Sequence, residues 1–407
     1  MNCRHCSAPL HHTFVDLGFA PPSNAYLTAE GLNKPETHFP LTVKVCEHCW
    51  LVQTEDYAHA GLLFDNDYAY FSSTSSSWLL HAKNFADQIT QELNLNGNNL
   101  VIEIASNDGY LLKNFVATTI PCLGIEPTHS TATAAELLGI PVIREFFTEE
   151  LGKRLAASGK HADLIVGNNV YAHVPDINDF TRGLKALLKP GGTITLEFPH
   201  LLRLIEFTQF DTIYHEHFSY LSLSTVHRIF THCGLRVWNV EKLPTHGGSL
   251  RIYGGHIEEN RQETDAVKNI LLDEDRHGLH RIETYTGFQK RAERIKDDLL
   301  LFLIEQKRKG KIVAAYGAAA KGNTLLNFAG IKPDLLPFVC DAAPAKQDKF
   351  LPGSHIPIYS PKLLFKFPPS FLIILPWNLS EEIIQQNIQL LERGTKFVTF
   401  IPYFSMI

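Results

Sequence analysis

Residues 100–111, with the sequence LVIEIASNDGYL, combine a short apolar run, a tight turn and the start of a helical pattern. The apolar residues around Glu103 predict a buried parallel strand, and Gly109 closes the turn before the helix. Backbone N–H groups at such a turn suit the carboxylate or phosphate end of a cofactor. About twenty residues later, CLGIE at 122–126 predicts a second strand ending in Glu126, where an acid can bind both hydroxyls of a ribose. An ordinary strand–turn–helix corner would show the same pattern.

The turn contains one glycine and therefore departs from the G-x-G-x-x-G pattern of dinucleotide sites. It resembles instead the first motif of class I S-adenosylmethionine (SAM) methyltransferases. That resemblance implies that Glu103 is the acid within the strand and that Glu126 is the ribose acid. The residues that we expect at the cofactor are Glu103, Ala105, Ser106, Asn107, Asp108, Gly109, Glu126, Pro127, Asn168 and Asn169.

The order of predicted elements indicates an α/β protein with two Rossmann-like sheets. Strands and helices alternate from Val101, one strand ends at Asn168, and 235–240 and 249–253 form a final antiparallel pair. Residues 258–309 are charged, with apolar residues at helical spacing, and are predicted to bridge two domains. A second strand–turn–helix unit follows at 311–323, KIVAAYGAAAKGN. We expect a small N-terminal zinc-binding domain (1–62), a central class I methyltransferase domain (63–257), a helical linker (258–309) and a C-terminal Rossmann-like domain (310–407).

Composition limits the class of protein. The chain has 407 residues, 44% of them hydrophobic, and a formal net charge of −6, which gives no reason to expect a nucleic-acid partner. It shows no secretory signal at Met1 and no apolar run of the ~18 residues that suggest a membrane span. Seven cysteines, an odd number, favour a reducing compartment. We therefore predict a cytoplasmic protein without a membrane segment.

Four cysteines form two pairs, Cys3-x-x-Cys6 and Cys46-x-x-Cys49. Two such pairs can place four thiolates around one tetrahedral Zn²⁺, and a Cys₄ site has no open position for catalysis. A redox-active pair is the alternative, but no thioredoxin-like context surrounds either pair. His5 and His48 lie inside the pairs and could replace a thiolate. We predict a structural zinc.

A second group of polar residues lies at 211–219, DTIYHEHFS, which contains Tyr214, His215, Glu216 and His217. The group could bind a metal, transfer protons or simply pack. A histidine beside a glutamate can gain basicity, so we interpret this cluster as acid–base chemistry. Glu216 is the candidate for orienting His217, although adjacent side chains can also face opposite ways. His173, in NNVYAHVPD, would by itself be read as a packing residue.

Two further stretches leave alternatives open. Residues 65–78, DNDYAYFSSTSSSW, predict a loop entering a helix, in which Tyr68 and Tyr70 either pack or face a pocket. The 317–322 turn and Lys321, with Lys346 and Lys349 nearby, could hold a pyrophosphate or form a purely structural corner.

Together these motifs resemble one family, the SAM-dependent C-methyltransferases of deoxysugar biosynthesis, over essentially the whole chain. The motifs are the two cysteine pairs, DYAYFSS, EIASNDGYLL, GIEPT, NNVYAHVPD, YHEHFSY, HGGSLR, YGAAAKGNTLLN, DAAPAKQDKFLPG and ILPWNL. The resemblance implies methylation at C3 of a nucleotide-linked 4-keto-6-deoxy sugar, carrying dTDP or GDP and bound between the domains. It implies His217 as the base, with Tyr214, Glu216, His173 and a tyrosine, preferably Tyr68, around the reacting carbon. The residues expected at the substrate are Asn24, Tyr70, His215, Lys321, Asn323 and Lys346.

The chemistry agrees with these residue types. A C4 ketone acidifies the C3 proton, so a positioned base can form an enolate whose oxygen needs hydrogen-bond donors. The C3 carbanion can then attack the SAM methyl group in line. An O-methyltransferase acting on a sugar or small molecule is the alternative enzyme, and a non-catalytic zinc-containing binding protein is the alternative without activity. We expect a monomer or a weak homo-oligomer.

Overall fold

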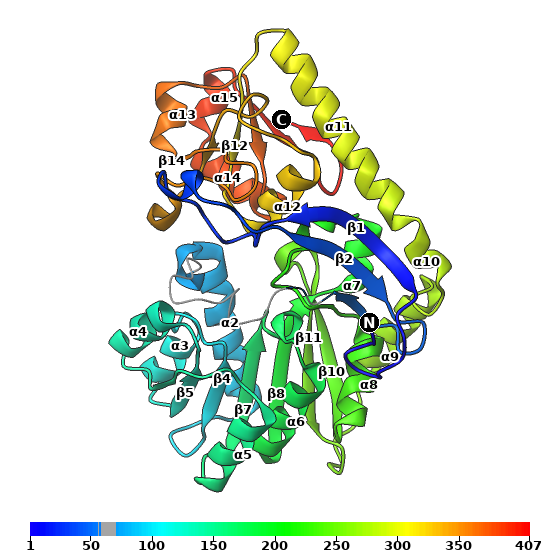
Figure 1. Cartoon of the computed structure of the whole chain (residues 1–407). Coiled ribbons are helices and arrows are strands. Elements are labelled where there is room, and N and C mark those ends of the chain that lie inside the picture. Colours follow the sequence, from blue (N-terminus) through cyan, green and yellow to red (C-terminus); the bar gives the residue numbers. More distant parts are fainter. Residues whose placement is uncertain (56, 58–70) are drawn as a thin grey trace.

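In the computed structural model, which describes residues 1–55, 57 and 71–407, the chain forms three β-sheets. Figure 1 shows the small N-terminal sheet crossing between the central sheet and the C-terminal sheet. The small sheet has the antiparallel order β1-β2-β3-β9. Its strands are β1 (His12–Ala20), β2 (Phe39–Val45), β3 (Val52–Thr54) and β9 (Ser219–Tyr220). β9 begins two residues after the 214–217 cluster and pairs with β3. The N-terminal sheet therefore contacts the segment that carries the predicted site.

The central sheet has seven strands in the order β10-β11-β8-β7-β4-β5-β6, and β11 is antiparallel to both of its neighbours. Its strands are β4 (Val101–Ile104), β5 (Cys122–Ile125), β6 (Val142–Ile143), β7 (Ala162–Asn168), β8 (Leu188–Pro199), β10 (Leu235–Leu243) and β11 (Ser249–His256). The predicted strands and the closing antiparallel pair are confirmed. The strand predicted at 193–197 is longer than expected, because the chain is already paired from Leu188.

Helices cover both faces of this sheet, and strand alternation sends side chains to each of them. On β7, Leu164 and Val166 pack on the side of α2 and α3, whereas Ile165 packs on the side of α5, α6 and α8. The helices are α2 (Ser76–Glu92), α3 (Leu112–Ala117), α4 (His129–Leu137), α5 (Glu149–Ala157), α6 (Ile177–Leu187), α7 (Leu201–Glu206) and α8 (Leu223–His232). The helix predicted at the end of 65–78 begins at Ser76, and the Ser75 side chain caps it by accepting the Trp78 N–H.

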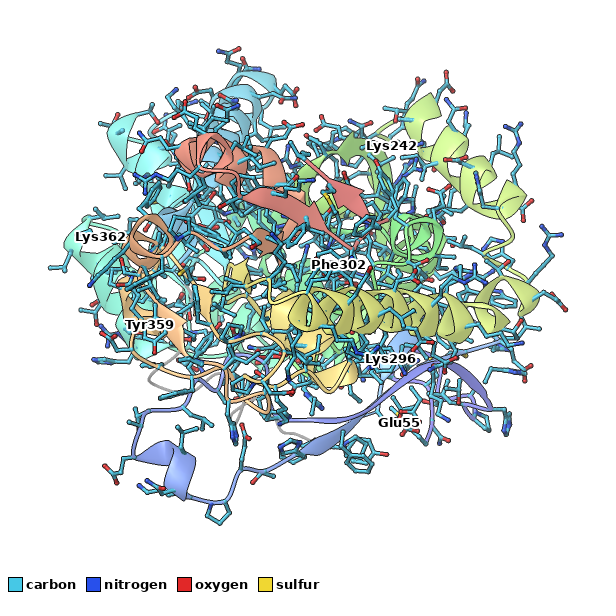
Figure 2. All side chains as sticks on the ribbon, turned by 90° about the horizontal axis from the view of Figure 1, so that it is seen from above. Glu55, Lys242, Lys296, Phe302, Tyr359 and Lys362 are labelled. Atoms are coloured by element: carbon cyan, nitrogen blue, oxygen red, sulfur yellow. The ribbon has the colours of Figure 1, made fainter. Side chains whose placement is uncertain are left out.

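The predicted bridging helices are α9 (Asp265–Arg276), α10 (Glu283–Thr286) and α11 (Phe288–Arg308). The expected apolar face begins on α10 and continues on α11, and Gly287 separates the two helices. Phe288 stacks on Phe14 of β1, while Phe302 contacts Phe371 and Phe400 of the C-terminal domain. Figure 2 shows α11 running across the molecule, with Phe302 directed toward the C-terminal strands.

The C-terminal sheet has the order β14-β13-β12-β15-β16-β17, parallel except for β17. Its strands are β12 (Val313–Tyr316), β13 (Val339–Cys340), β14 (Ile358–Tyr359), β15 (Phe371–Ile374), β16 (Lys396–Thr399) and β17 (Ser405–Met406). Its helices are α12 (Ala320–Phe328), α13 (Lys362–Lys366), α14 (Ser380–Gln386) and α15 (Gln389–Glu392). Among the described residues, no helix is long and apolar enough to cross a membrane.

Candidate active site and metal centre

The four predicted zinc ligands come together in the N-terminal domain. The Sγ atoms of Cys3, Cys6, Cys46 and Cys49 all lie within 4.8 Å of one another. The two pairs have matching turns: Ser7 N–H donates to the Cys3 carbonyl, and Trp50 N–H donates to the Cys46 carbonyl. Four soft thiol ligands in this spacing fit a tetrahedral Zn²⁺.

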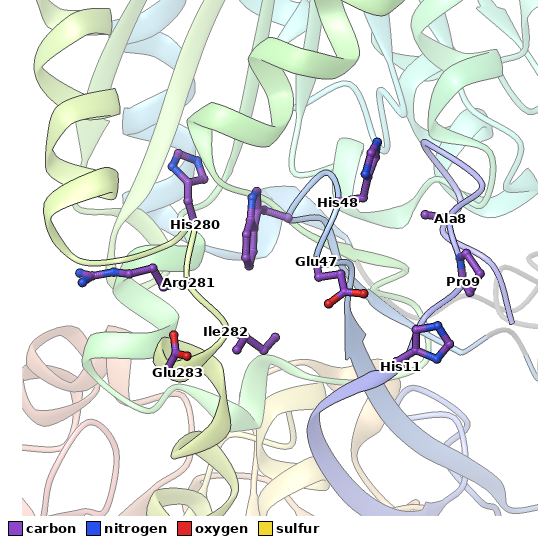
Figure 3. A pocket seen from close by; sticks show the side chains of 10 residues that line it. Ala8, Pro9, His11, Glu47, His48, His280, Arg281, Ile282 and Glu283 are labelled. Atoms are coloured by element: carbon purple, nitrogen blue, oxygen red, sulfur yellow. The ribbon is translucent and has the colours of Figure 1, made fainter.

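Neither neighbouring histidine belongs to this thiol cluster. The His5 Nδ1 lies 2.8 Å from the Asn178 Oδ1 at the start of α6, so His5 ties the metal domain to the central domain. His48 instead lines a cavity of about 640 Å³, together with Glu47, Trp50 and residues 280–283 (Figure 3). Of the predicted catalytic, cofactor and substrate residues that the structure describes, none lines this cavity.

The predicted cofactor turn has an unusual backbone. Ala105, Asn107 and Gly109 have φ values of 56°, 49° and 78°, in the left-handed region where non-glycine residues are uncommon. Such strain persists where the surroundings impose it and is concentrated at functional sites. The helix that follows begins only at Leu112, so the turn itself, and not a helix N-terminus, presents the N–H groups.

Side chains around this turn hold it in place. Glu126, buried at the end of β5, accepts the Asn107 N–H at 3.0 Å and the Thr128 N–H at 2.9 Å. Pro127 lies between Glu126 and Thr128. Asn107 and Asp108 accept the backbone N–H groups of Ser72 and Ser73. The turn is therefore fixed from β5 and from the segment that leads into α2.

Several buried polar atoms at this edge of the sheet have no hydrogen-bond partner among the described residues. They are the Ser106 Oγ and the Oδ1 atoms of Asn168 and Asn169. Burial raises the pKa of Glu103 well above its usual value. Buried polar groups are nearly always paired, so this set fits a polar cofactor such as SAM, with its amino, carboxylate and ribose groups.

His217 lies at the centre of the predicted catalytic cluster. Its Nδ1 is 2.8 Å from the Thr212 carbonyl oxygen, which can only accept, so Nδ1 carries the hydrogen and Nε2 keeps its lone pair. The His217 ring is 4.6 Å from the His173 ring and 4.0 Å from the Tyr214 ring, centroid to centroid. Burial lowers the pKa of His217 well below its usual value and that of His173 to about 4, so both rings are neutral.

Glu216 does not orient His217, in contrast to our interpretation of their adjacency. The Thr212 carbonyl has that position, and the Glu216 Oε1 accepts instead from the Asn24 Nδ2 at 3.1 Å. Successive side chains of the 214–217 turn diverge. His215 also faces away from His217: its Nε2 donates to the Pro40 carbonyl, and its ring contacts Phe39.

The segment that carries His217 is hydrogen-bonded to the N-terminal zinc-binding domain. The Thr54 N–H donates to the Phe218 carbonyl, and the Thr54 Oγ1 donates to the His217 carbonyl at 3.1 Å. Since β3 and β9 are paired strands, the position of the imidazole depends on the small sheet.

The residues predicted to bind substrate on the C-terminal side have partners within the chain. The Lys321 Nζ donates to the Asn378 Oδ1 at 2.8 Å and lies over the Trp377 ring. The Asn323 Nδ2 donates to the Ser23 carbonyl, and the Lys346 Nζ donates to the Ala318 carbonyl. Lys321, at the start of α12, thus bonds to a residue that follows β15, and Lys346 bonds to the loop that follows β12. Tyr68 and Tyr70 lie outside the described residues.

Three residues at the site were not singled out from the sequence. His246, inside the HGGSLR motif, has a left-handed backbone (φ 53°), and its Nε2 is 3.0 Å from the Asn169 Nδ2. The buried Asp211 accepts the Trp377 Nε1–H at 2.7 Å, which joins the central and C-terminal domains. The left-handed histidine before two glycines has no reliable sequence signal, and the Asp211–Trp377 pair is separated by more than 160 residues.

Comparison with protein families places these features in a common architecture. Residues 3–64 match a zinc-binding domain family, 68–240 a methyltransferase domain and 244–402 the C-methyltransferase C-terminal domain. The chain is 34% identical over 400 residues to the C-methyltransferase NovU of Streptomyces niveus, covering 98% of this chain and 95% of that one.

Solved structures resemble the chain more distantly. The magnesium protoporphyrin IX methyltransferase of Synechocystis PCC 6803 is 14% identical, with a TM-score of 0.35, over 43% of this chain and 82% of that one. A SAM-dependent methyltransferase of Clostridium acetobutylicum is 12% identical, with a TM-score of 0.36, over 43% and 90%. The assignment rests on the curated relative and the three domain matches, which decide for carbon methylation over the alternatives. The chain belongs to the C-methyltransferase family and is a SAM-dependent enzyme with an N-terminal zinc-binding domain.

Proposed function

We propose that this enzyme methylates C3 of a nucleotide-linked 4-keto-6-deoxy sugar, in the biosynthesis of a branched deoxysugar. The proposal is supported by the motif resemblance over the whole chain and by the similarity to a C-methyltransferase. The observation that carries it is the environment of His217, a neutral imidazole with one nitrogen fixed and the other available.

A general base for the C3 proton must be unprotonated, and the lone pair that accepts the proton must be held in a fixed orientation. The Thr212 carbonyl fixes the His217 tautomer with the hydrogen on Nδ1, which leaves Nε2 as the proton acceptor. Burial keeps the ring neutral, and the neighbouring His173 ring adds to this effect. His217 is therefore ready to accept a proton over the physiological pH range.

A short segment leads from the end of β7, where we expect SAM, to His173, whose ring contacts the ring of His217. Asn168 is the last residue of β7, Asn169 follows it, and the short helix Tyr171–His173 begins two residues later. Bound SAM would supply an electrophilic methyl group. Glu103, Ser106, Glu126 and Asn168 are the residues that we expect to hold it, and the His173 ring lies 4.6 Å from the His217 ring, centroid to centroid.

The substrate's nucleotide is expected on the C-terminal domain. In open α/β sheets, ligands bind beyond the carboxyl ends of the strands where the order of connections reverses. Here that point lies between β12 and β15, which are neighbours in the sheet but are followed by crossovers to opposite sides. Lys321, in the first turn of α12, and Asn378, in the short helix Trp377–Leu379 after β15, lie at that point and bond to each other. A cation there suits a pyrophosphate.

The test is deuterium exchange at C3 together with methyl transfer, using a panel of 4-keto-6-deoxy sugar nucleotides. With the accepted substrate, His217→Asn should lose turnover by ~10²–10⁴, the usual loss for a general base, and should also lose exchange. SAM binding should remain. His161→Asn, which changes an exposed histidine before β7, serves as the control and should behave as wild type. Near-normal exchange in His217→Asn would exclude His217 as the base, and no reaction of wild type with any keto sugar nucleotide would exclude the substrate class.

A further inference from the structure

The Glu216 carboxyl group has an unusual environment for an acid. It is 1% exposed, and its Oε1 accepts from the Asn24 Nδ2 at 3.1 Å. Its Oε2 is buried and has no hydrogen-bond partner among the residues that the structure describes. A buried polar atom of this kind calls for a partner that arrives with the ligand.

Asn24 belongs to a loop of the N-terminal zinc-binding domain that contacts Glu216 in the central domain and two residues of the C-terminal domain. The Ser23 carbonyl, directly before it, accepts the Asn323 Nδ2 of α12 at 2.6 Å. Two residues later, the Tyr26 hydroxyl donates to the Ala318 carbonyl at 2.6 Å. Asn24 is therefore fixed from both sides, and its carboxamide holds the Glu216 carboxyl group in one position.

The surroundings favour the protonated form of Glu216. Burial raises its pKa to about 7, although its own backbone N–H and the donors of Asn24 oppose the rise. The titratable groups that face it from other elements are the phenols of Tyr26 and Tyr220, whose pKa values burial raises further. The neighbouring rings of His173 and His217 are neutral, so none of these groups supplies a positive charge that would hold a carboxylate.

We propose that Glu216 is a proton-bearing catalytic acid that donates a hydrogen bond to the C4 oxygen of the substrate, and that Asn24 is its positioning residue. This inference rests on the proposed function, because it needs a substrate with a carbonyl beside the methylated carbon. A carboxylic acid kept neutral by burial can donate to a developing enolate in this way.

The proton balance of this step is simple. The C3–H bond breaks, its proton goes to the His217 Nε2, and the electron pair moves to the C4 oxygen. Glu216 keeps its own proton and donates it as a hydrogen bond to that oxygen. When the C3–CH₃ bond forms and the S–CH₃ bond of SAM breaks, the carbonyl is restored, and His217 passes its proton to water. Glu216 ends as it began.

The first test compares Glu216→Gln with Glu216→Ala. A glutamine amide can accept from Asn24 and still donate to the substrate, whereas alanine can do neither. Turnover and C3 exchange should therefore fall ~10²–10³-fold in Glu216→Ala, the usual loss for one oxyanion donor, and should fall clearly less in Glu216→Gln. A Glu216→Gln variant as inactive as Glu216→Ala, with SAM still bound, would overturn the proposal.

The pH profile supplies a readout that a merely structural role would not change. In wild type, the donor is present below the Glu216 pKa of about 7, so turnover should fall as the pH rises through that value. In Glu216→Gln this alkaline limb should disappear. In Asn24→Ala, loss of the side-chain donor, which favours the charged carboxylate, should move the limb to higher pH while the plateau falls. An unmoved limb in both variants would count against the proposal.

The control is Asn33→Ala, which removes an exposed asparagine of the same domain. It should keep the wild-type rate and profile. The same experiments distinguish a failure of the acid role of Glu216 from a failure of the proposed function. If wild type exchanges C3 deuterium but Glu216→Gln fails, only the acid role is lost. If wild type exchanges with no keto sugar nucleotide, the proposed function fails first.

Discussion

Glu126 and Asp341 have the same position in the two Rossmann-like sheets. Each follows the second strand of its sheet and accepts the N–H of the residue two places later, Thr128 at 2.9 Å and Ala343 at 2.8 Å. Each also accepts an N–H from the turn after the first strand, that of Asn107 at 3.0 Å or that of Ala318 at 2.7 Å. The two turns differ in what covers them.

The turn at Ala318 is covered by the chain itself. The Tyr26 hydroxyl and the Lys346 Nζ both donate to the Ala318 carbonyl, at 2.6 and 2.9 Å. The turn at 105–109 instead contains the Ser106 Oγ and lies near the Asn168 Oδ1, two buried atoms without a hydrogen-bond partner among the described residues. The same acid position is therefore expected to bind a ribose in the central domain and to be structural in the C-terminal domain.

The first prediction concerns SAM affinity. Glu126→Ala should weaken SAM binding by about 1.5–3 kcal/mol, because hydrogen bonds to a charged group are worth that much. Calorimetric titration with SAM measures the change. Lys362→Met, at an exposed position of α13, is the control and should leave SAM binding as it is. Equal SAM dissociation constants for Glu126→Ala and wild type would remove Glu126 from the ribose site.

The second prediction is that the C-terminal domain binds no NAD. The turn after β12, where the pyrophosphate of NAD would have to approach the backbone, is covered by Tyr26 and Lys346, which both donate to the Ala318 carbonyl. Titration of the full chain with NAD should show no binding up to millimolar concentration. Saturable binding that Asp341→Ala abolishes would contradict this interpretation.

The third prediction concerns the metal. Freshly purified protein should contain one zinc per chain, and Cys46→Ser should lose it and lower the melting temperature, because metal binding is coupled to folding. Since β3 pairs with β9, this loss should also reduce turnover by disturbing the segment that carries His217. Metal analysis and thermal unfolding test both points. Cys122→Ser, outside the thiol cluster, should keep the zinc.

The sequence was informative where a pattern is local. The strand–turn–helix units, the acid at Glu126, the cysteine pairs and the closing antiparallel strands follow from periodicity and spacing. The sequence did not show that Ser219 and Tyr220 would join the N-terminal sheet, because a two-residue strand has no periodicity and its partner lies more than 160 residues away. The divergence of Glu216 and His217 was equally hidden, since it is set by Asn24 and by the Thr212 carbonyl, which are contacts of the folded chain.

The last prediction follows from Lys321. Its ammonium group lies over Trp377 and donates to Asn378, and burial lowers its pKa to about 8, with Asp211 opposing the shift. Lys321 is therefore a cation below about pH 8 and loses its charge above it. If it holds the pyrophosphate, KM for the sugar nucleotide should rise as the pH increases through 8 to 9.

Variants separate the charge from the packing. Lys321→Met should raise KM ~10–100-fold, the equivalent of one charge-assisted hydrogen bond, and KM should no longer change between pH 7 and 9. Lys321→Arg keeps a charge throughout this range and should also remove the pH dependence, at a lower KM than Lys321→Met. The control is again Lys362→Met, at an exposed position of α13. A wild-type KM that stays constant to pH 9 would show that the Lys321 charge is not used, and the pyrophosphate would then have to be held elsewhere.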